Sequence, residues 1–384
     1  MKTYTGIIDM DSFKRTLSDL LKGKGGVLMY LSAVGILLGV YAVIKIVIEG
    51  HGAVTNTSSL VPWGIQITTY IFFALVSGGC TFVNFFGHIF YKKEYESVST
   101  KVVFLGMLTA LTGLGALASE LGRVERLYMF VIAPNPSSPM WWMVLWYTLY
   151  TLVKIFEFID TKRGRHSKSL LWATFLVAIV TYSTIAAIFG IAEQRVYYYG
   201  AVLPVYFLCV GFLSGSALSA IVAAAAARQT PSLSDMIIKP FRTFLGIGLG
   251  LAFFLTFWRL IIGSAAQVEG SEIFEMTMAS TVIEDILLAL VVPFLLLYFS
   301  KGYKGLFASS LIVLVMQFNS RYHLIIGGFK IPVFRAYDIP EVVPYSPSHV
   351  EAFIVIATIS FVVFFYLLAE KSRLLETFHK KEDA

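Results

Sequence analysis

The sequence has few charged residues. Asp, Glu, Lys and Arg make up 14% of its 384 residues, whereas a typical soluble domain has roughly 25%. Hydrophobic residues make up 57% of the chain. This composition predicts an integral membrane protein. The net charge of +6 does not indicate a nucleic-acid partner, because Lys and Arg gather on the cytoplasmic loops of membrane proteins.

Ligands for redox cofactors are also scarce. The two cysteines, Cys80 and Cys209, lie in apolar runs and form no CxxC pair, so we expect this chain to bind no iron–sulfur cluster. Of the six histidines only His88 lies in a predicted span, which leaves no facing pair for a bis-histidine haem. The sequence has no P-loop, GxSxG or HExxH motif. We therefore expect no haem, no metal site and no catalytic residue, and a subunit that is non-catalytic alone.

Long apolar runs are what the sequence has instead. A membrane span needs about 20 mostly apolar residues. No cleavable signal peptide is expected before the first run, because the first 25 residues are polar. Ten runs qualify: Gly26–Ile48, Thr68–Phe90, Val102–Ser119, Met140–Phe158, Leu170–Gly190, Ala201–Ala227, Phe241–Ile262, Met278–Tyr298, Gly305–Gln317 and Ala352–Leu368. The ninth is short, and an extension to about Ile325 is the alternative.

The distribution of Lys and Arg predicts the orientation. With ten spans both termini lie on one side, and that side carries 22 of these residues, among them Lys154, against 7 on the other. The positive-inside rule then places both termini in the cytoplasm. We expect a multi-pass protein of the cytoplasmic membrane.

A faint internal repeat suggests how the spans are grouped. A shift of 137 residues places Ser77-Gly78 on Ser214-Gly215 and Tyr70 on Phe207. Chance similarity between apolar helices is the alternative. If the repeat is real, the fold is an all-α polytopic membrane protein of about 10 transmembrane helices, with two four-helix bundles (spans 2–5 and 6–9) flanked by spans 1 and 10.

We expect the stretch Pro62–Cys80 to form the helix around which the rest of the fold is organised. Pro62 and Trp63 stand at its start, where amphipathic rings favour the membrane interface. Small residues near its other end allow close helix packing. The same holds for three GxxxG pairs: Gly35/Gly39, Gly211/Gly215 and Gly246/Gly250.

Polar groups near the outer ends of the spans are candidate site residues. Glu120 and Arg123 lie three residues apart, so on a helix they share a face. They form either an interfacial ion pair or the polar wall of a ligand pocket. Tyr70 and Tyr182 each need a hydrogen-bond partner inside an apolar span. A neighbouring helix or a carbonyl group of a bound ligand would supply it.

Two adjacent carboxylates, Glu284 and Asp285, lie well inside span 8. Neighbouring positions point about 100° apart on a helix, so at least one should face the interior of the bundle. A proton path is one interpretation, because ionisable groups at membrane depth are expensive and usually functional. A structural salt bridge to Arg259 or Arg321 is the other.

Three stretches resemble the NrfD/PsrC-like family of quinone-interacting membrane subunits. Gly50–Gly79 contains the VT…PWG…GG pattern, and Glu120–Trp142 contains E-x-x-R-x-x-R followed by NPSSPMWW. Tyr182, in VTYSTIA, falls where polysulfide reductase has a quinone-site tyrosine. Where that enzyme has a pocket Asn and His, this chain has Ile67 and Tyr70, so Gln66 or Tyr70 would substitute.

The resemblance implies two four-helix bundles and no cofactor of the chain's own. It implies a menaquinone-type quinone or quinol as substrate and, on the outer face, a ferredoxin-like iron–sulfur subunit of a multisubunit respiratory complex. The ten spans and short cytoplasmic loops favour the DsrP-type subunit of a sulfite-reductase-associated complex, and the hydrogenase and polysulfide branches stay open. The implied quinone-binding residues are Tyr182, Glu120, Arg123, Tyr70, Trp63 and Gln66.

The implied division of the chain is a cytoplasmic segment (1–25), the first span and outer loop (26–66), a first bundle with the quinone site (67–200), a second bundle (201–330), and an outer loop with the last span and tail (331–384).

Two other classes of function stay open. One is a secondary transporter or a proton-translocating subunit without quinone chemistry, which a parallel repeat and buried carboxylates would suit. The other is a passive anchor for an electron carrier. A transporter should work alone, whereas a respiratory subunit should co-purify with iron–sulfur absorbance.

Overall fold

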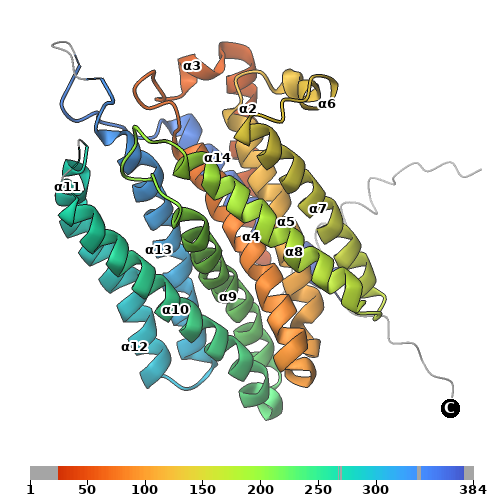
Figure 1. Cartoon of the computed structure of the whole chain (residues 1–384). Coiled ribbons are helices and arrows are strands. Elements are labelled where there is room, and N and C mark those ends of the chain that lie inside the picture. The colour runs from red at the N-terminus through yellow and green to blue at the C-terminus, as the bar shows by residue number, and fades with distance from the viewer. Residues whose placement is uncertain (1–24, 267, 269, 335–338, 376–384) are drawn as a thin grey trace, which may run out of the picture.

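The computed structural model describes residues 25–266, 268, 270–334 and 339–375, and these contain helices but no strand. Figure 1 shows long helices lying side by side, with short elements capping one end. We call the end that bears α3 (His51–Val54) and α6 (Met129–Ile132) the upper end and the opposite end the lower end. Most of the N-terminal segment and the last nine residues of the tail (376–384) lie outside the described residues.

Nine helices in the described part of the chain are long and apolar enough to cross a membrane. A further long helix, α13 (Tyr303–Lys330), has 28 residues but carries several polar ones toward its upper end. It extends well past Gln317, because polar side chains such as Asn319, Ser320 and Arg321 find hydrogen-bond partners on neighbouring helices. The other long elements are α2 (Gly26–Glu49), α4 (Ile65–Phe90), α5 (Lys92–Glu120), α7 (Pro139–Lys162), α8 (Lys168–Gly190), α9 (Leu203–Gln229), α10 (Ser234–Ala265), the continuous α11, η3 and α12 (Glu272–Ser280, Thr281–Val291 and Val292–Phe299) and α14 (His349–Lys371).

The helices form two four-helix bundles, as predicted. In the first bundle α4 packs on α5, α5 on α7, α7 on α8, and α8 returns to α4. In the second, α9, α10, η3 with α12, and α13 close the same kind of ring. The contacts between the bundles are also paired, because α8 packs on α9 and α13 packs on α4. In each bundle the first and the last helix therefore contact the other bundle, which is the arrangement expected of a parallel duplication. The residue boundaries of the predicted division stay a prediction.

Helix α4 lies at the centre of the molecule. Every residue from Gln66 to Phe85 is buried, which fits a helix that is hydrophobic on all sides. It contacts α5, α8, α9, α13 and α14. The stretch that begins at Pro62 thus organises the fold.

The two bundles meet backbone to backbone where α4 crosses α9. A Cβ atom added to Gly79 would lie 1.9 Å from the carbonyl oxygen of Gly211, and one added to Gly215 would lie 2.1 Å from the carbonyl carbon of Gly79. No side chain fits in this crossing. The Gly246/Gly250 pair is different, because a Cβ on Gly250 would meet nothing within 4 Å. Of the two GxxxG pairs in the second bundle, only the one on α9 therefore makes a close backbone contact, whereas a Cβ on Gly246 would lie 3.8 Å from Leu297.

Helices α2 and α14 stand outside the two bundles. The Gly35/Gly39 pair of α2 packs closely on Ser360 and Ala357 of α14, while most other residues of α2 are exposed. Helix α14 in turn packs on α5 and α4. These are the predicted flanking spans 1 and 10, and both lie beside the first bundle.

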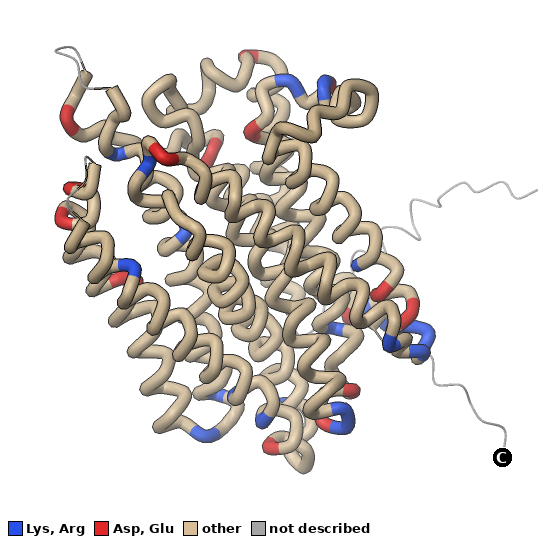
Figure 2. Tube along the Cα trace, in the orientation of Figure 1, with Lys and Arg blue, Asp and Glu red and all other residues tan. Residues whose placement is uncertain are grey.

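Charged residues gather at the two ends of the bundle and leave its middle largely uncharged (Figure 2). This is the pattern of a protein that crosses a bilayer. Which end faces the cytoplasm stays a prediction. One residue in the predicted count was misplaced: Lys154 is not a loop cation, since it lies inside α7 with 0% of its surface exposed.

Candidate functional site

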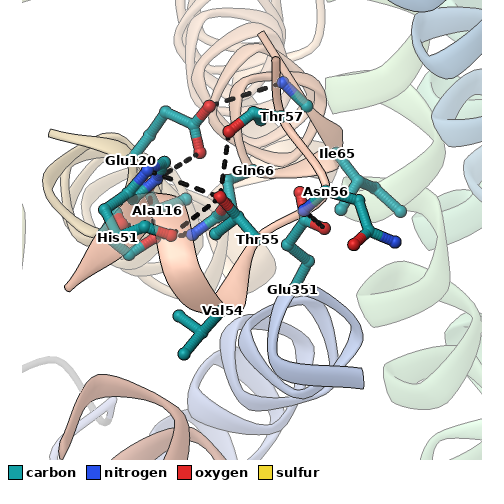
Figure 3. Close-up of polar contacts among 12 residues, drawn as sticks. His51, Val54, Thr55, Asn56, Thr57, Ile65, Gln66, Ala116, Glu120 and Glu351 are labelled. Carbon is teal, nitrogen blue, oxygen red and sulfur yellow. Dashed lines mark hydrogen bonds and ion pairs between the residues drawn. The ribbon is translucent and has the colours of Figure 1, made fainter. Parts of the chain in front are cut away.

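A cluster of polar residues closes the upper end of the first bundle (Figure 3). Glu120, the last residue of α5, shares its carboxylate between His51 of α3 (Oε2 to Nε2, 3.4 Å) and the backbone N–H of Gly64 (to Oε1, 3.4 Å). Only 6% of the Glu120 side chain is exposed. A buried carboxylate beside an imidazole can accept and pass on protons.

Gln66 lies directly beneath this carboxylate and is fully buried. Its Nε2 donates to the backbone carbonyl of Ser119 at 3.1 Å and contacts the Ser119 hydroxyl at 3.3 Å. Its Oε1 has no partner among the described residues. Because buried polar atoms are almost always paired, this oxygen is available to a donor from a ligand. We call Glu120, His51, Gln66 and Ser119 the upper cluster.

A second carboxylate holds the loop that covers the upper cluster. Glu351 accepts hydrogen bonds from the backbone of Asn56 at 3.0 Å, the backbone of Ser348 at 2.7 Å and the hydroxyl of Tyr345 at 2.7 Å. The same tyrosine oxygen accepts from the backbone N–H of Ile65 at 2.9 Å. Glu351 was not among the residues predicted from the sequence. The signal was present in SPSHVE, where Ser348 and Glu351 form a capping box at the start of α14.

His51 gives the upper cluster a dependence on pH. The hydrogen bond to Glu120 raises the pKa of the imidazole above its usual value of about 6.5, while partial burial acts in the opposite direction. A raised pKa in the folded state stabilises the protein below the unfolded pKa, and this contribution is lost as pH rises through the folded pKa.

We therefore expect the difference in unfolding free energy between the wild type and His51→Gln to be largest at mildly acidic pH. It should shrink as the pH rises through and beyond neutrality. Thermal unfolding of both proteins in detergent over a pH series measures this difference. His349→Gln, which alters an exposed histidine at the same end, is the control. A difference that grows with pH would contradict the assigned hydrogen bond.

Two other predicted site residues have separate roles. The ring of Trp63 packs edge-on against Phe189 of α8 at 5.1 Å and Phe329 of α13 at 5.6 Å, so it joins the tops of the two bundles. Arg123 is exposed. The predicted Glu120–Arg123 ion pair was wrong, because α5 ends at Glu120 and the extended backbone that follows destroys the shared helical face.

A column of tyrosines continues downward from Gln66. The Tyr70 ring lies 5.8 Å from that of Tyr147, which lies 6.3 Å from that of Tyr150, and the ring of Tyr182 lies 5.3 Å from that of Tyr150. Tyr70 donates to the sulfur of Met143 at 3.3 Å. Its hydrogen-bond partner is therefore a neighbouring helix, which is one of the two partners considered from the sequence. The buried Tyr182 hydroxyl makes no well-aligned hydrogen bond among the described residues, although it lies within interaction distance of the Tyr150 and Ser77 hydroxyls.

The structure does not bring Tyr182 and Glu120 together. Glu120 contacts Gly64, whereas Tyr182 packs on Gly78. These two glycines lie 14 residues apart, which is about 21 Å along the α4 axis at roughly 1.5 Å per residue. One quinone ring cannot contact both side chains.

A buried ion pair that was not predicted from the sequence lies below the tyrosines. Lys154 donates to Glu157 Oε2 at 2.7 Å, and neither residue is more than 3% exposed. Glu157 Oε1 accepts from Asn84 at 2.9 Å, and Asn84 in turn accepts from Tyr95 at 3.0 Å. The sequence signal was a Lys and a Glu three residues apart inside an otherwise apolar span.

In the second bundle, Glu284 and Asp285 face α13. Asn319 donates to Glu284 at 2.5 Å, and Ser320 donates to Asp285. His323 lies 3.4 Å from Glu284 Oε2 and 3.8 Å from Asp285 Oδ1. Both carboxylates lie on η3, an 11-residue π-helix, and such wider turns often occur at functional sites. His323 was set aside in the sequence because it follows the short predicted span.

The predicted alternative of a salt bridge from these carboxylates to Arg259 or Arg321 was wrong. Arg321 points toward α9, where it donates to the hydroxyl of Tyr206 at 3.1 Å. Arg259 lies over the ring of Tyr197 at 4.3 Å and donates to its carbonyl at 2.8 Å. Within the described part of the chain, no group of three or more His, Cys, Asp and Glu residues could hold a metal ion.

Comparisons with known proteins agree with this architecture. A family model described as polysulphide reductase, NrfD, matches residues 53–332, which include both bundles and leave out α2 and α14. A selenate reductase subunit of Mesobacillus selenatarsenatis is 22% identical, with 86% of this chain and 89% of the relative aligned. A putative dimethyl sulfoxide reductase membrane subunit of Halobacterium salinarum is 23% identical over 57% of this chain and 58% of the relative. The chain therefore belongs to the polysulphide reductase NrfD family.

Proposed function

We propose that this chain is the membrane subunit of a respiratory reductase complex, where it exchanges electrons between a menaquinone-type quinone and an iron–sulfur partner. Family membership supports this proposal, as do two relatives named as subunits of reductases. The partner is a ferredoxin-like subunit that docks at the upper end. This chain lies in the cytoplasmic membrane with both of its termini in the cytoplasm. Sulfite or another sulfur compound is the proposed terminal substrate. The names of the relatives add selenate and dimethyl sulfoxide as chemical alternatives.

The upper cluster is the proposed place of the quinone ring. The observation that carries this is the fully buried Gln66 Oε1, which lacks a partner among the described residues. The same side chain donates to Ser119, the residue before the buried Glu120. A quinol hydroxyl is a suitable donor to that oxygen. The Trp63 ring provides an apolar wall beside the position. Arg123, exposed beyond the helix end, is placed at the rim, where it would meet the partner.

Oxidation of one quinol releases two electrons and two protons. The electrons leave the ring toward the clusters of the partner, which must therefore dock on the upper end. Gln66 orients a hydroxyl, and Glu120 accepts a proton and shares it with His51, with which it is already in contact at 3.4 Å. Reduction of a quinone uses the same groups in reverse. Tyr70 and Tyr182, which lie deeper, take part through their hydroxyls rather than through contact with the ring.

Gln66→Leu is expected to raise the KM for quinol by up to about tenfold, because a neutral hydrogen bond contributes roughly 0.5–1.5 kcal/mol. The measurement is quinol oxidation by the whole complex in detergent, with a short-chain quinol as donor. Gln194→Leu is the matched control, since Gln194 is an exposed glutamine at the same end. Equal KM values for the two variants would place the ring elsewhere.

A proton-translocating subunit without quinone chemistry is the second candidate. It is favoured by the contact of Glu284 and Asp285 with His323 around a π-helix, which suits a proton path. Purification separates the two functions. Stoichiometric quinone and iron–sulfur absorbance in the purified complex support the first, and proton transport by the isolated chain supports the second.

A further inference from the structure

A large apolar groove opens between the two bundles, toward the lower end of the molecule. It has a volume of about 610 Å³ and runs between α8 and α10, with α4 and α9 as its floor. Figure 1 is viewed from this side, with α8 and α10 in front. We call it the lower groove. It shares no residue with the upper cluster.

Aromatic rings give the lower groove a continuous apolar surface. The Phe86 ring of α4 lies 5.8 Å from that of Phe175 on α8 and 5.9 Å from that of Phe212 on α9. The Phe212 ring in turn lies 6.1 Å from that of Phe244 on α10. On the rim, Ile247 is exposed. Because an unfilled apolar hollow forfeits the dispersion contacts of its walls, an apolar occupant from the membrane is expected here.

A transmembrane helix and a lipid chain are the two kinds of occupant that a bilayer offers. A helix takes the corresponding place beside the first bundle, where α14 packs on α4 and α5, the first two helices of that bundle. Helices in membranes approach closely through small residues, as Gly79 and Gly215 do where α4 crosses α9. The lining of the lower groove contains no glycine and no alanine. A flexible chain, which adapts to the spaces between large rings, therefore suits the groove better than a rigid helix.

Exposed lysines continue the walls of the groove to the lower end. Lys239 lies one turn before Thr243 on α10, and Lys168 lies two turns before Phe175 on α8. Residues four or seven apart share a helical face, so both lysines stand below residues that line the groove. Lys92 begins α5, next to the lower end of the floor helix α4.

Acidic residues on the same segments are fewer than the lysines. Glu94 and Glu96 follow Lys92 and Lys93 on α5, and Asp235 lies one turn below Lys239 on α10. The rim of the lower groove therefore carries an excess of positive charge. A positive rim beside an apolar hollow matches a ligand with a negative head and an apolar tail.

We propose that the lower groove is a binding site for an anionic phospholipid. One acyl chain lies among the phenylalanine rings, and the phosphate lies within reach of Lys92, Lys168 and Lys239. Lysines at the ends of membrane helices attract anionic headgroups and contribute about fivefold in affinity each. The buried methylene groups of the chain add to this affinity. The bound lipid contacts α8 of one bundle and α10 of the other, so it fills the joint between them on the side that α14 does not cover.

A phosphatidylglycerol that carries a photoactivatable diazirine in one acyl chain tests this proposal. It is added to the whole complex in detergent and irradiated, and the labelled peptides of this chain are identified by mass spectrometry. We expect label in the segment 208–212, which lies in the floor of the groove. Unlabelled phosphatidylglycerol should compete at a concentration about 100-fold lower than phosphatidylcholine, because three lysines contribute about fivefold each.

Two pairs of variants separate the head from the tail. Lys168→Gln with Lys239→Gln should weaken competition by phosphatidylglycerol about 25-fold and leave phosphatidylcholine unchanged. Lys301→Gln with Lys304→Gln is the matched control, since it removes two exposed lysines at the same end of α12 and α13.

Cys209→Phe places a larger side chain in the groove, where Cys209 is half-buried, and should weaken the competition by both lipids. Val205→Phe is its control, because Val205 is exposed one turn away on the same helix and does not line the groove.

Equal competition by the two lipids, or equal effects of the two lysine pairs, would overturn the anionic lipid site. Label that appears in the isolated chain and disappears in the whole complex would overturn it as well, because a helix of a partner subunit then fills the groove. None of these outcomes depends on quinone turnover.

Discussion

Lys154→Met is expected to destabilise the protein by about 3–5 kcal/mol, since removal of one partner leaves a buried charge uncompensated. The charge left behind is the carboxylate of Glu157, whose side chain is only 4% exposed. Asn84 supplies its other hydrogen bond, and a neutral donor does not replace an ammonium group at 2.7 Å. The free energy of unfolding in mixed detergent micelles measures the effect.

The double variant Lys154→Met with Glu157→Gln is the matched control. It contains no buried charge at this position, so most of the lost stability should return. The double variant should therefore lose much less stability than the sum of the two single losses. A double variant that is less stable than Lys154→Met alone would contradict the account of an uncompensated buried charge.

Gly79→Ala is expected to destabilise the protein by about 1–3 kcal/mol, because an added methyl group overpacks a filled interface. Its Cβ atom would lie 1.9 Å from the carbonyl oxygen of Gly211, and a backbone atom cannot turn aside as a flexible side chain can. Helices α4 and α9 would have to separate. The thermal unfolding midpoint in detergent measures the loss.

Gly250→Ala is the control for this prediction. A Cβ atom there meets nothing within 4 Å, and alanine favours a helix over glycine by about 1 kcal/mol. The control should therefore be as stable as the wild type or more stable. Equal stability of the two alanine variants would contradict the close crossing of the bundles.

The sequence predicted the fold well because membrane spans follow from local composition. The ten runs needed only the length and hydropathy of each segment, whereas their grouping into two bundles came from the internal repeat and from the family resemblance. The extent of α13 was uncertain for the same reason, since Gln317, Ser320 and Arg321 lower its local hydropathy although all three are buried. Their partners come from α9 and η3, which are distant in sequence.

The candidate site was predicted less completely. Glu120 accepts from Gly64 and Gln66 donates to Ser119, so both lie at the upper end of the first bundle, and their role in quinone binding stays a prediction. Helix α5 ends at Glu120, so Arg123 no longer shares a helical face with it. The spacing of the two residues in the sequence does not indicate where the helix ends. His51 comes from α3 and Glu351 from α14, so only the fold brings them to the upper end of the first bundle. Lys154 was counted as a surface cation because a count of charges does not distinguish a loop from a buried helix face.

The contact between Gly79 and Gly215 limits how the molecule can work. A carrier that opens alternately to the two sides of a membrane rocks one half against the other about their interface. Here two main chains are in direct contact where α4 crosses α9, and the Trp63 ring packs on a phenylalanine from each half at the upper end. Rocking would pull apart atoms that no solvent or lipid can replace. The two halves therefore form one rigid body, and any energy conversion must proceed by small shifts of side chains inside it.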